Sequence, residues 1–118
     1  YAADCPPIQF ATKEVCRDMA SPTMRAHERM KRLARYMLYF EAAVFDFPWQ
    51  DESEVAVKVV TDSDWAGCSQ TRRSTSGGAM QLGRHTLRTW ATTQPAVTLS
   101  SAEAEYYAMV EGATRGLG

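Results

Sequence analysis

Two short clusters of acidic residues carry the side chains best suited to chemistry in this sequence. The first cluster is Asp62-Ser63-Asp64 and the second is Glu103-Ala104-Glu105. The stretch between them, residues 65 to 102, contains no Asp or Glu. It holds four arginines, which are Arg72, Arg73, Arg84 and Arg88. Carboxylates beside a basic surface are the arrangement that a metal-dependent enzyme acting on a polyanion needs. Composition alone leaves open the alternative of chance spacing on a solvated surface.

The carboxylates themselves predict a site for divalent cations. Hydrolysis of a phosphodiester at neutral pH requires a strong nucleophile and neutralisation of developing charge, and two divalent ions about 4 Å apart provide both. Mg²⁺ prefers hard oxygen ligands. Asp62 and Asp64 would share one face of a strand, although Asp64 could already lie in the following loop. Taken alone, a Thr-Asp pair at a strand end is more typical of a turn.

On a helix, only one of the two glutamates can face such a site, because Glu103 and Glu105 lie about 200° apart. Ser100 and Glu103 match a capping box, Ser-x-x-Glu, in which the glutamate reaches back to the helix start. The capping role therefore goes to Glu103. Asp62 and Glu105 are the predicted catalytic metal ligands, and Mg²⁺ or Mn²⁺ is the predicted ion.

Three strands and a helix are predicted to position these residues. The Val-rich run 54–61 predicts a strand that leads directly into the first acidic cluster. A polar loop ending at Gly77-Gly78 would follow, then short strands over 79–82 and 85–91. The last element is a helix that opens at Ser100.

The first 41 residues predict two helices. Asp4 is expected to cap the first, with Pro6 and Pro7 in its opening turn, and Ser21 is expected to cap the second before Pro22. The predicted apolar face of the second helix consists of Ala26, Met30, Leu33, Ala34 and Met37. Opposite it, a basic stripe is formed by Arg25, Arg29 and Arg32, with Arg35 at its margin. This stripe is either a solvated cationic surface or a phosphate contact.

A polar segment over residues 42–53 gives the best domain boundary. The predicted division is 1–50 for the helical part and 53–118 for the part that carries the acidic clusters.

The overall composition excludes several classes of protein. The chain has 118 residues, a net charge of -1 and three cysteines at unrelated spacings. A disulfide framework or zinc site is disfavoured, so a reducing, intracellular protein is expected. No apolar run is long enough to span a membrane, and no signal peptide precedes the chain, so neither membrane contact nor secretion is expected. His27 and His85 lack partners at the spacing of a zinc site or hydrolase.

Three motif blocks in series resemble the ribonuclease H domain of copia-type retrotransposon Pol polyproteins. They are Thr61 to Cys68 (TDSDWAGC), Thr71 to Gly78 (TRRSTSGG) and Ser100 to Tyr106 (SSAEAEY), and Trp90 and Gln94 also fit. Several blocks in order make this resemblance specific. Residues 1–10 and 19–36, with Lys31-Arg32-Leu33-Ala34-Arg35-Tyr36, resemble the end of the same polyprotein's reverse transcriptase.

The resemblance implies a mixed α/β, ribonuclease H-like fold that is incomplete here, with three antiparallel strands and then a helix, preceded by two helices of the reverse transcriptase tail. It implies cleavage of the RNA strand of RNA–DNA hybrids by two-metal catalysis during reverse transcription. Asp62 and Glu105 match the family's first two carboxylates. The family's further aspartates would lie beyond Gly118, so the isolated chain is expected to be inactive.

The same resemblance implies that Cys68, Ser101 and Ala102 approach the minor groove of the hybrid, where ribose 2′-hydroxyls distinguish RNA from DNA. Arg72 and Arg73 are candidate phosphate contacts, or else part of a solvated turn.

The expected partners are an RNA–DNA hybrid and the remainder of the Pol polyprotein, in a cytoplasmic replication particle or in the nucleus. Two competing hypotheses are a noncatalytic nucleic-acid-binding remnant of a degenerate element and an inactive, poorly folding product. Salt-dependent binding to a hybrid duplex would separate these two.

Overall fold

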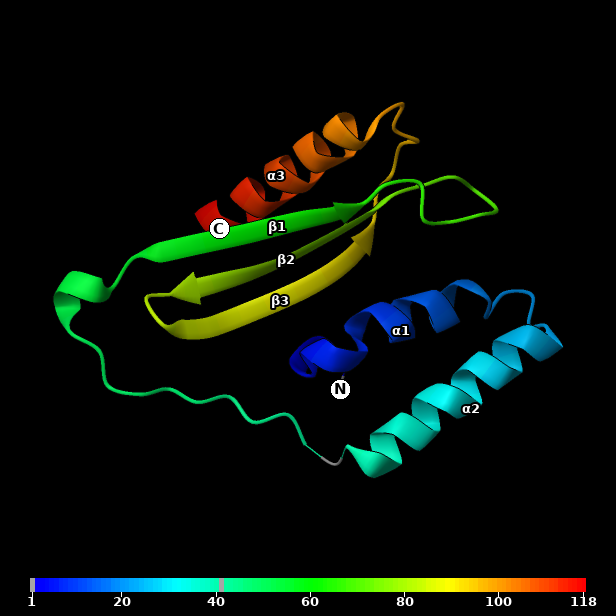
Figure 1. Cartoon of the computed structure of the whole chain (residues 1–118), viewed down its shortest axis with the longest axis horizontal. Coiled ribbons are helices and arrows are strands. Elements are labelled where there is room, and N and C mark those ends of the chain that lie inside the picture. The colour runs from blue at the N-terminus through cyan, green and yellow to red at the C-terminus, as the bar shows by residue number, and fades with distance from the viewer. Residues whose placement is uncertain (1, 41) are drawn as a thin grey trace. The chain divides into compact units, whose positions relative to one another are not determined.

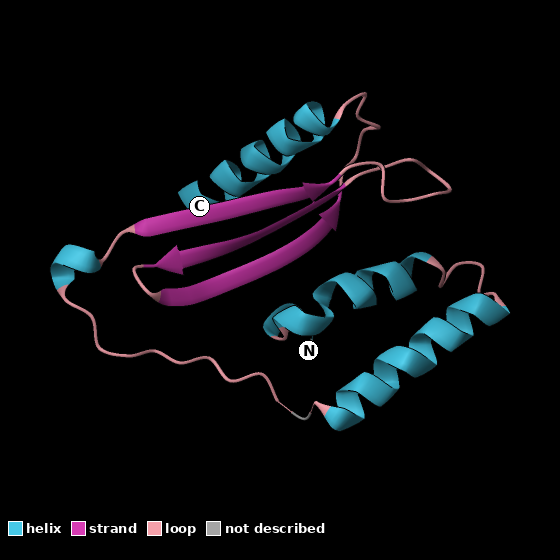
Figure 2. Cartoon of the chain, viewed as in Figure 1, coloured by secondary structure: helices cyan, strands magenta, loops and turns pink. Residues whose placement is uncertain are grey.

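The computed structural model describes residues 2–40 and 42–118, apart from the side chain of Glu54. The chain divides into two compact units, Tyr1–Val44 and Phe45–Gly118. The first contains helices and the second contains a sheet with one long helix (Figures 1 and 2). No helix in the described residues is both long enough and apolar enough to cross a bilayer.

The first unit is a pair of helices, as predicted, but different residues begin them. After a short 3-10 helix, Ala2–Asp4, come α1, Pro6–Arg17, and α2, Met24–Tyr39. Cys5 precedes α1 without a side-chain cap, so the predicted capping by Asp4 is wrong. At α2 the cap is Thr23, whose Oγ1 accepts from the Ala26 amide at 3.2 Å. The prediction of Ser21 was wrong because the helix begins two residues later than expected, after an extended Thr23.

The covered residues of α2 belong to the predicted apolar stripe: Ala26 is buried, and Leu33 and Met37 are half-buried. Two other members of the stripe, Met30 and Ala34, are exposed. The face toward α1 includes Arg29, whose Nη1 lies 3.3 Å from Asp18 Oδ2 at the end of α1. Arg29 is therefore not opposite the packed face. An arginine can lie there because its aliphatic stem covers apolar surface while the guanidinium reaches a carboxylate.

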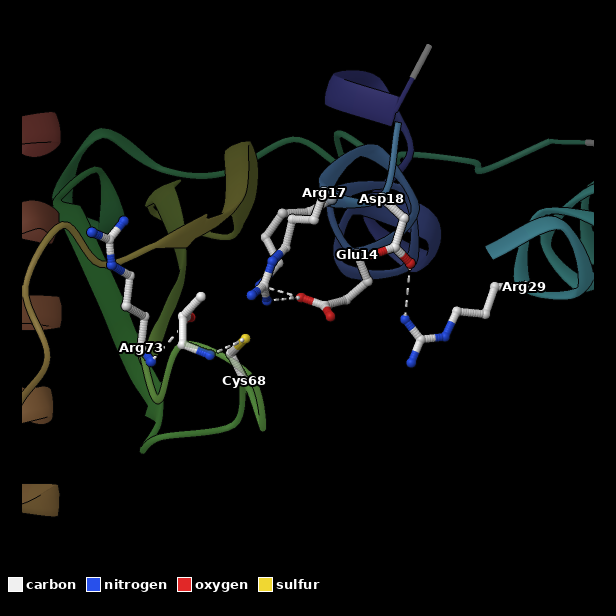
Figure 3. A network of polar contacts seen from close by, with 8 residues as sticks. Glu14, Arg17, Asp18, Arg29, Cys68 and Arg73 are labelled. Carbon is white, nitrogen blue, oxygen red and sulfur yellow. Dashed lines mark hydrogen bonds and ion pairs between the residues drawn. The ribbon is translucent and has the colours of Figure 1, made fainter. Parts of the chain in front are cut away.

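A second ion-pair group stabilises α1. Glu14 Oε1 lies 3.0 Å from Lys13 Nζ and 3.1 Å from Arg17 Nη1, and Figure 3 shows the Arg17 contact. Burial raises the pKa of Glu14, but hydrogen bonds and charge attraction from Lys13 and Arg17 outweigh it, so the pKa lies below its usual value.

The second unit has the predicted order of strand, strand, strand, helix. A 3-10 turn, Glu52–Glu54, precedes β1, Val57–Asp64; β2 is Thr75–Leu82, β3 is His85–Thr93 and α3 is Ser101–Leu117. The strands form an antiparallel sheet in the order β1-β2-β3. This confirms a mixed α/β architecture with three antiparallel strands followed by a helix. Gly83, with φ of 58°, makes the tight β2–β3 turn.

The two glycines predicted to end a loop lie inside β2 instead. Gly78 pairs with Trp90 on β3, and a Cβ at position 78 would stand 2.2 Å from the indole Cζ2. A glycine here is therefore a packing requirement and not a turn signal. Asp64, for which the sequence left both strand and loop open, is the last residue of β1.

Small residues let α3 pack closely on the sheet. Ala104, Ala108 and Gly112 are spaced four residues apart and are all buried. A Cβ on Gly112 would lie 2.4 Å from Thr61 Cγ2 on β1. The helix axis is therefore held close to β1, and this fixes which side chains at the start of α3 reach the end of that strand.

Candidate functional site

The start of α3 is fixed by reciprocal capping, as predicted for Ser100 and Glu103. The Ser100 Oγ accepts from the Glu103 amide at 3.1 Å. The Glu103 carboxylate in turn accepts from the Leu99 amide at 2.7 Å, one residue earlier than the usual capping box. The Glu103 carboxylate is thus used in capping the N-terminus of α3, and Glu105 is the carboxylate free to face the strand.

Glu105 reaches the end of β1 at a residue that the sequence did not single out. Its Oε1 accepts from Ser63 Oγ at 2.7 Å and from the Ser63 amide at 3.2 Å. The Ser63 amide donates to Glu105 and not to a carbonyl of β2, so this N–H group points to the side of β1 away from β2. Its position between two aspartates was the only sequence signal for Ser63. The carboxylate therefore lies at the outer edge of β1.

Asp62 is the neighbouring residue on the same strand. It is exposed, and its carboxylate makes no hydrogen bond with Glu105. Exposure alternates along β1, with Val59, Thr61 and Ser63 more covered and Val60, Asp62 and Asp64 exposed. Since α3 covers the first set, Asp62 leaves the strand toward the opposite face. Glu105 contacts the strand at Ser63, one residue beyond Asp62, and approaches from the face that α3 covers. The Asp62 side chain leaves the strand on the opposite face. No cluster of three possible metal ligands occurs among residues 2–40 and 42–118.

The loop after β1 holds three of the predicted nucleic-acid contacts in a tight turn. The Arg72 amide donates to the Cys68 carbonyl at 2.7 Å, and the Cys68 amide donates to the Arg73 carbonyl at 3.3 Å. Arg72 has a φ of 58°, and both arginines are exposed. Figure 3 shows Cys68 and Arg73 in this turn, where the Cys68 Sγ also accepts from the Thr71 amide.

A buried polar cluster, absent from the sequence prediction, holds that loop next to the start of α3. The Ser74 Oγ accepts from the Ala66 amide at 3.0 Å and contacts the Thr98 Oγ1 at 2.9 Å. The Gln94 Nε2 donates to Ser76 Oγ and to the Ala104 carbonyl. Each of these hydrogen bonds replaces one to water, whereas the buried Oε1 of Gln94 has no partner among the described residues, so the cluster fixes geometry at the desolvation cost of one unpaired acceptor.

The remaining predicted contacts lie at two places. Ser101 and Ala102 are exposed in the first turn of α3. Arg25, Arg29 and Arg32 belong to α2 in the other unit, where Arg29 pairs with Asp18. Arg32 lines, with Leu33 and Tyr36, an apolar cavity between α1 and α2 of about 380 Å³.

A second polar group missed by sequence joins α3 to β3. Thr92 Oγ1 lies 2.7 and 2.8 Å from the Glu111 carboxylate oxygens. Arg115 pairs with Glu111 at 2.8 Å and stacks over Trp90, with its Cζ 5.1 Å from the ring centre. The contacts of Glu111 with Thr92 and Arg115 attach the C-terminal half of α3 to β3, at a distance along the helix from Glu105.

Comparison with known proteins places these features in a wider group. The chain is 38% identical over 105 residues to an uncharacterized mitochondrial protein of Arabidopsis thaliana, covering 88% of this chain and 42% of that protein. It is 29% identical over 102 residues to the retrovirus-related Pol polyprotein from transposon RE1 of the same plant, 86% of this chain but 7% of the polyprotein.

A third relative is the secreted RxLR effector protein 161 of Plasmopara viticola, 31% identical over 106 residues, with 89% of this chain and 73% of the effector covered. The chain thus spans less than half of the two plant relatives. No protein-family model and no solved structure matches it.

Proposed function

The chain belongs to the family of copia-type retrotransposon Pol polyproteins, and from this we propose that residues 53–118 are the opening part of a ribonuclease H-like nuclease. In the whole polyprotein that nuclease hydrolyses the RNA strand of RNA–DNA hybrids. Asp62 and Glu105 are its metal ligands in this chain, with Mg²⁺ or Mn²⁺ as the ion. The two preceding helices are the tail of the reverse transcriptase.

The observation that carries the proposal is the contact between Glu105 and Ser63. It brings a helix carboxylate to the strand residue that directly follows Asp62, with 2.7 Å between Glu105 Oε1 and Ser63 Oγ. The capping of α3 and the small residues that hold it against β1 make this arrangement rigid. Rigid placement of carboxylates is what a metal site requires.

The donor set suits a hard divalent cation. Both predicted ligands are carboxylates, and Glu105 Oε2 has no hydrogen-bond partner among the described residues. When bound, such ions supply an activated water and neutralise developing charge on the phosphate. In this chain, Ser63 orients Glu105, and Asp62 is exposed on the face of the strand opposite α3.

The surroundings of this strand end suit a polyanion. Arg72 and Arg73 lie in the loop that follows β1, and Ser101 and Ala102 lie in the first turn of α3, where unpaired amides favour negative charge. We assign the arginines to phosphate contacts, and Cys68, Ser101 and Ala102 to the groove of the hybrid. On α2, the exposed Arg25 and Arg32 are assigned to further phosphate contacts, whereas Arg29 is already paired with Asp18.

Metal binding tests the proposal directly. Mn²⁺ titrated into the chain should broaden the amide signals of residues 61–64 and 103–106 before any others. Asp62→Asn and Glu105→Gln should each weaken Mn²⁺ binding by about tenfold or more, since each removes a ligand. The matched control, Glu52→Gln, removes an exposed carboxylate elsewhere in the unit and should leave binding unchanged. Broadening centred elsewhere, or equal affinity in all variants, would refute the assignment.

Cleavage and hybrid binding test the rest. Two carboxylates are too few to hold two ions, so the 118-residue chain should cleave hybrid no faster than its Asp62→Asn variant. It should nevertheless bind hybrid with an affinity that falls as salt rises, and Arg72→Ala with Arg73→Ala should reduce that salt dependence. Hybrid binding without Mn²⁺ binding would instead favour a noncatalytic nucleic-acid-binding module.

A further inference from the structure

His85 holds the segment before β1 onto the β2–β3 turn. Its Nε2 lies 2.7 Å from the Pro48 carbonyl oxygen, and its Nδ1 lies 3.2 Å from Gln50 Nε2. The ring also meets Phe47 edge-on, with centroids 5.2 Å apart. Both ring nitrogens of a half-buried histidine are therefore used by the segment Phe47–Gln50, which we call the anchoring segment.

Gln50 completes the attachment and fixes its own orientation. Its Oε1 accepts from the Arg84 amide at 2.8 Å, and its Nε2 donates to the Leu82 carbonyl at 3.1 Å. These two partners leave no choice of amide orientation, because one is a donor and the other an acceptor. The second hydrogen of the Gln50 amide group then points at His85.

The protonation state of His85 follows from these partners. A carbonyl oxygen only accepts, so the hydrogen between His85 and Pro48 belongs to Nε2. The Gln50 amide nitrogen only donates, so His85 Nδ1 must accept with its lone pair. Only a neutral imidazole satisfies both, because a protonated ring donates from both nitrogens. Protonation would set one N–H against another.

We propose that His85 is a pH-sensitive clasp, which keeps the anchoring segment on the β2–β3 turn while the imidazole is neutral and releases it when Nδ1 takes a proton. Histidine is the side chain whose charge ordinarily changes between about pH 5 and 8. The clasp is closed while the ring is neutral and opens when acid protonates Nδ1.

The nearby charged groups do not take part in the clasp. Arg84 adjoins His85 in the turn, Asp46 and Asp51 flank the anchoring segment, and Lys58 lies on β1, which β2 separates from β3. None of them forms a hydrogen bond or ion pair with the imidazole in the part of the chain that the structure describes. The response thus rests on the contact between His85 Nδ1 and Gln50, because Nε2 keeps its hydrogen and its bond to Pro48 in both protonation states.

Opening the clasp would lengthen the connection between the two units. With the clasp closed, the chain is tethered to the second unit from Phe47 onward; with it open, the tether begins near Ala56, whose carbonyl bonds the Gly83 amide. The nine residues freed span up to about 30 Å when extended. The clasp therefore sets the length of unattached chain that precedes β1.

The Arg84 amide reports the state of the clasp, because its hydrogen bond to Gln50 depends on it. Amide exchange of the 118-residue chain should be followed between about pH 5 and 8, with rates corrected for the intrinsic effect of pH. Protection of Arg84 should fall about tenfold or more toward low pH. The Gln94 amide, bonded to the Ser74 carbonyl, should keep its protection and serves as the internal reference.

The chain has two histidines, which supplies a matched control. His85→Gln can still donate to Pro48 but does not titrate, so its Arg84 protection should be independent of pH. His27→Gln removes the other histidine, on α2, and should retain the full response. Equal Arg84 protection at both pH limits in the unaltered chain, or a response that survives in His85→Gln, would overturn the clasp. Neither outcome depends on metal or nucleic acid, so the proposed nuclease function stands or falls separately.

Discussion

The substitution Gly78→Ala, which adds one methyl group, should lower the stability of the second unit, whereas the same change at the neighbouring Gly77 should be tolerated. A Cβ at position 78 would lie 2.2 Å from Trp90 Cζ2, at least 1.2 Å short of ordinary contact, which begins at 3.4 Å. At Gly77 the nearest atoms are backbone oxygens at 3.9 Å, so there is room. Neither glycine has a positive φ, and alanine therefore introduces no backbone strain at either position.

The expected magnitudes follow from these distances. Trp90 is 6% exposed and lies under Arg115, so the ring cannot swing freely into solvent. Overpacking of this kind costs about 1–3 kcal/mol. Replacing glycine with alanine also stabilises by about 0.4–1 kcal/mol through the unfolded state, equally at both sites. Gly78→Ala should therefore be less stable than Gly77→Ala by about 1–3 kcal/mol.

Urea denaturation monitored by tryptophan fluorescence measures this difference. Trp90 is the buried indole, while Trp49 and Trp65 are 90% and 47% exposed, so the change in emission reports mainly on Trp90. In a Trp90→Phe background, the smaller ring should make Gly78→Ala much less costly; because that background lacks the fluorescent probe, all members of this double-mutant cycle are followed by circular dichroism. Equal stability of Gly77→Ala and Gly78→Ala would refute the packing argument.

Three further changes test other parts of the structure. Ser100→Ala removes the N-terminal cap of α3 and should lower the free energy of unfolding by about 1 kcal/mol, measured in a thermal melt; an unchanged stability would mean that Glu103 alone is enough to cap the helix. Thr92→Val removes the hydroxyl whose one hydrogen is shared between the two carboxylate oxygens of Glu111 and should cost about 1–3 kcal/mol in urea denaturation, because the acceptor is charged; an unchanged midpoint would show that Arg115 suffices. Glu14→Gln should make the helix content of α1 and α2 depend less on pH in the acid range. Since the folded pKa of Glu14 is depressed, its contribution is complete above the usual value of 4.5 and disappears as pH falls through the lower folded value. An acid transition followed by circular dichroism that is the same in both proteins would contradict this.

Local sequence patterns were sufficient for the order and type of the elements. The run of valines in β1, the serine and glutamate at the start of α3, and the spacing of apolar residues in the first two helices each depend on near neighbours in the chain. For the same reason the capping role of Glu103, and hence the inward position of Glu105, could be deduced without coordinates. The motif series added the family, which the plant transposon relatives support.

What the sequence determined was therefore which residues could act locally, in caps, turns and periodic faces. The tertiary structure decided everything that joins distant positions: Ser63 with Glu105, Gly78 with Trp90, Thr92 with Glu111, and His85 with Pro48. It also moved Gly77 and Gly78 from a loop into a strand and turned α2 so that Arg29 faces α1. The physical reason is that such contacts are set by the register of the sheet and the distance of a helix from it, and neither is encoded in the spacing of residues along one element.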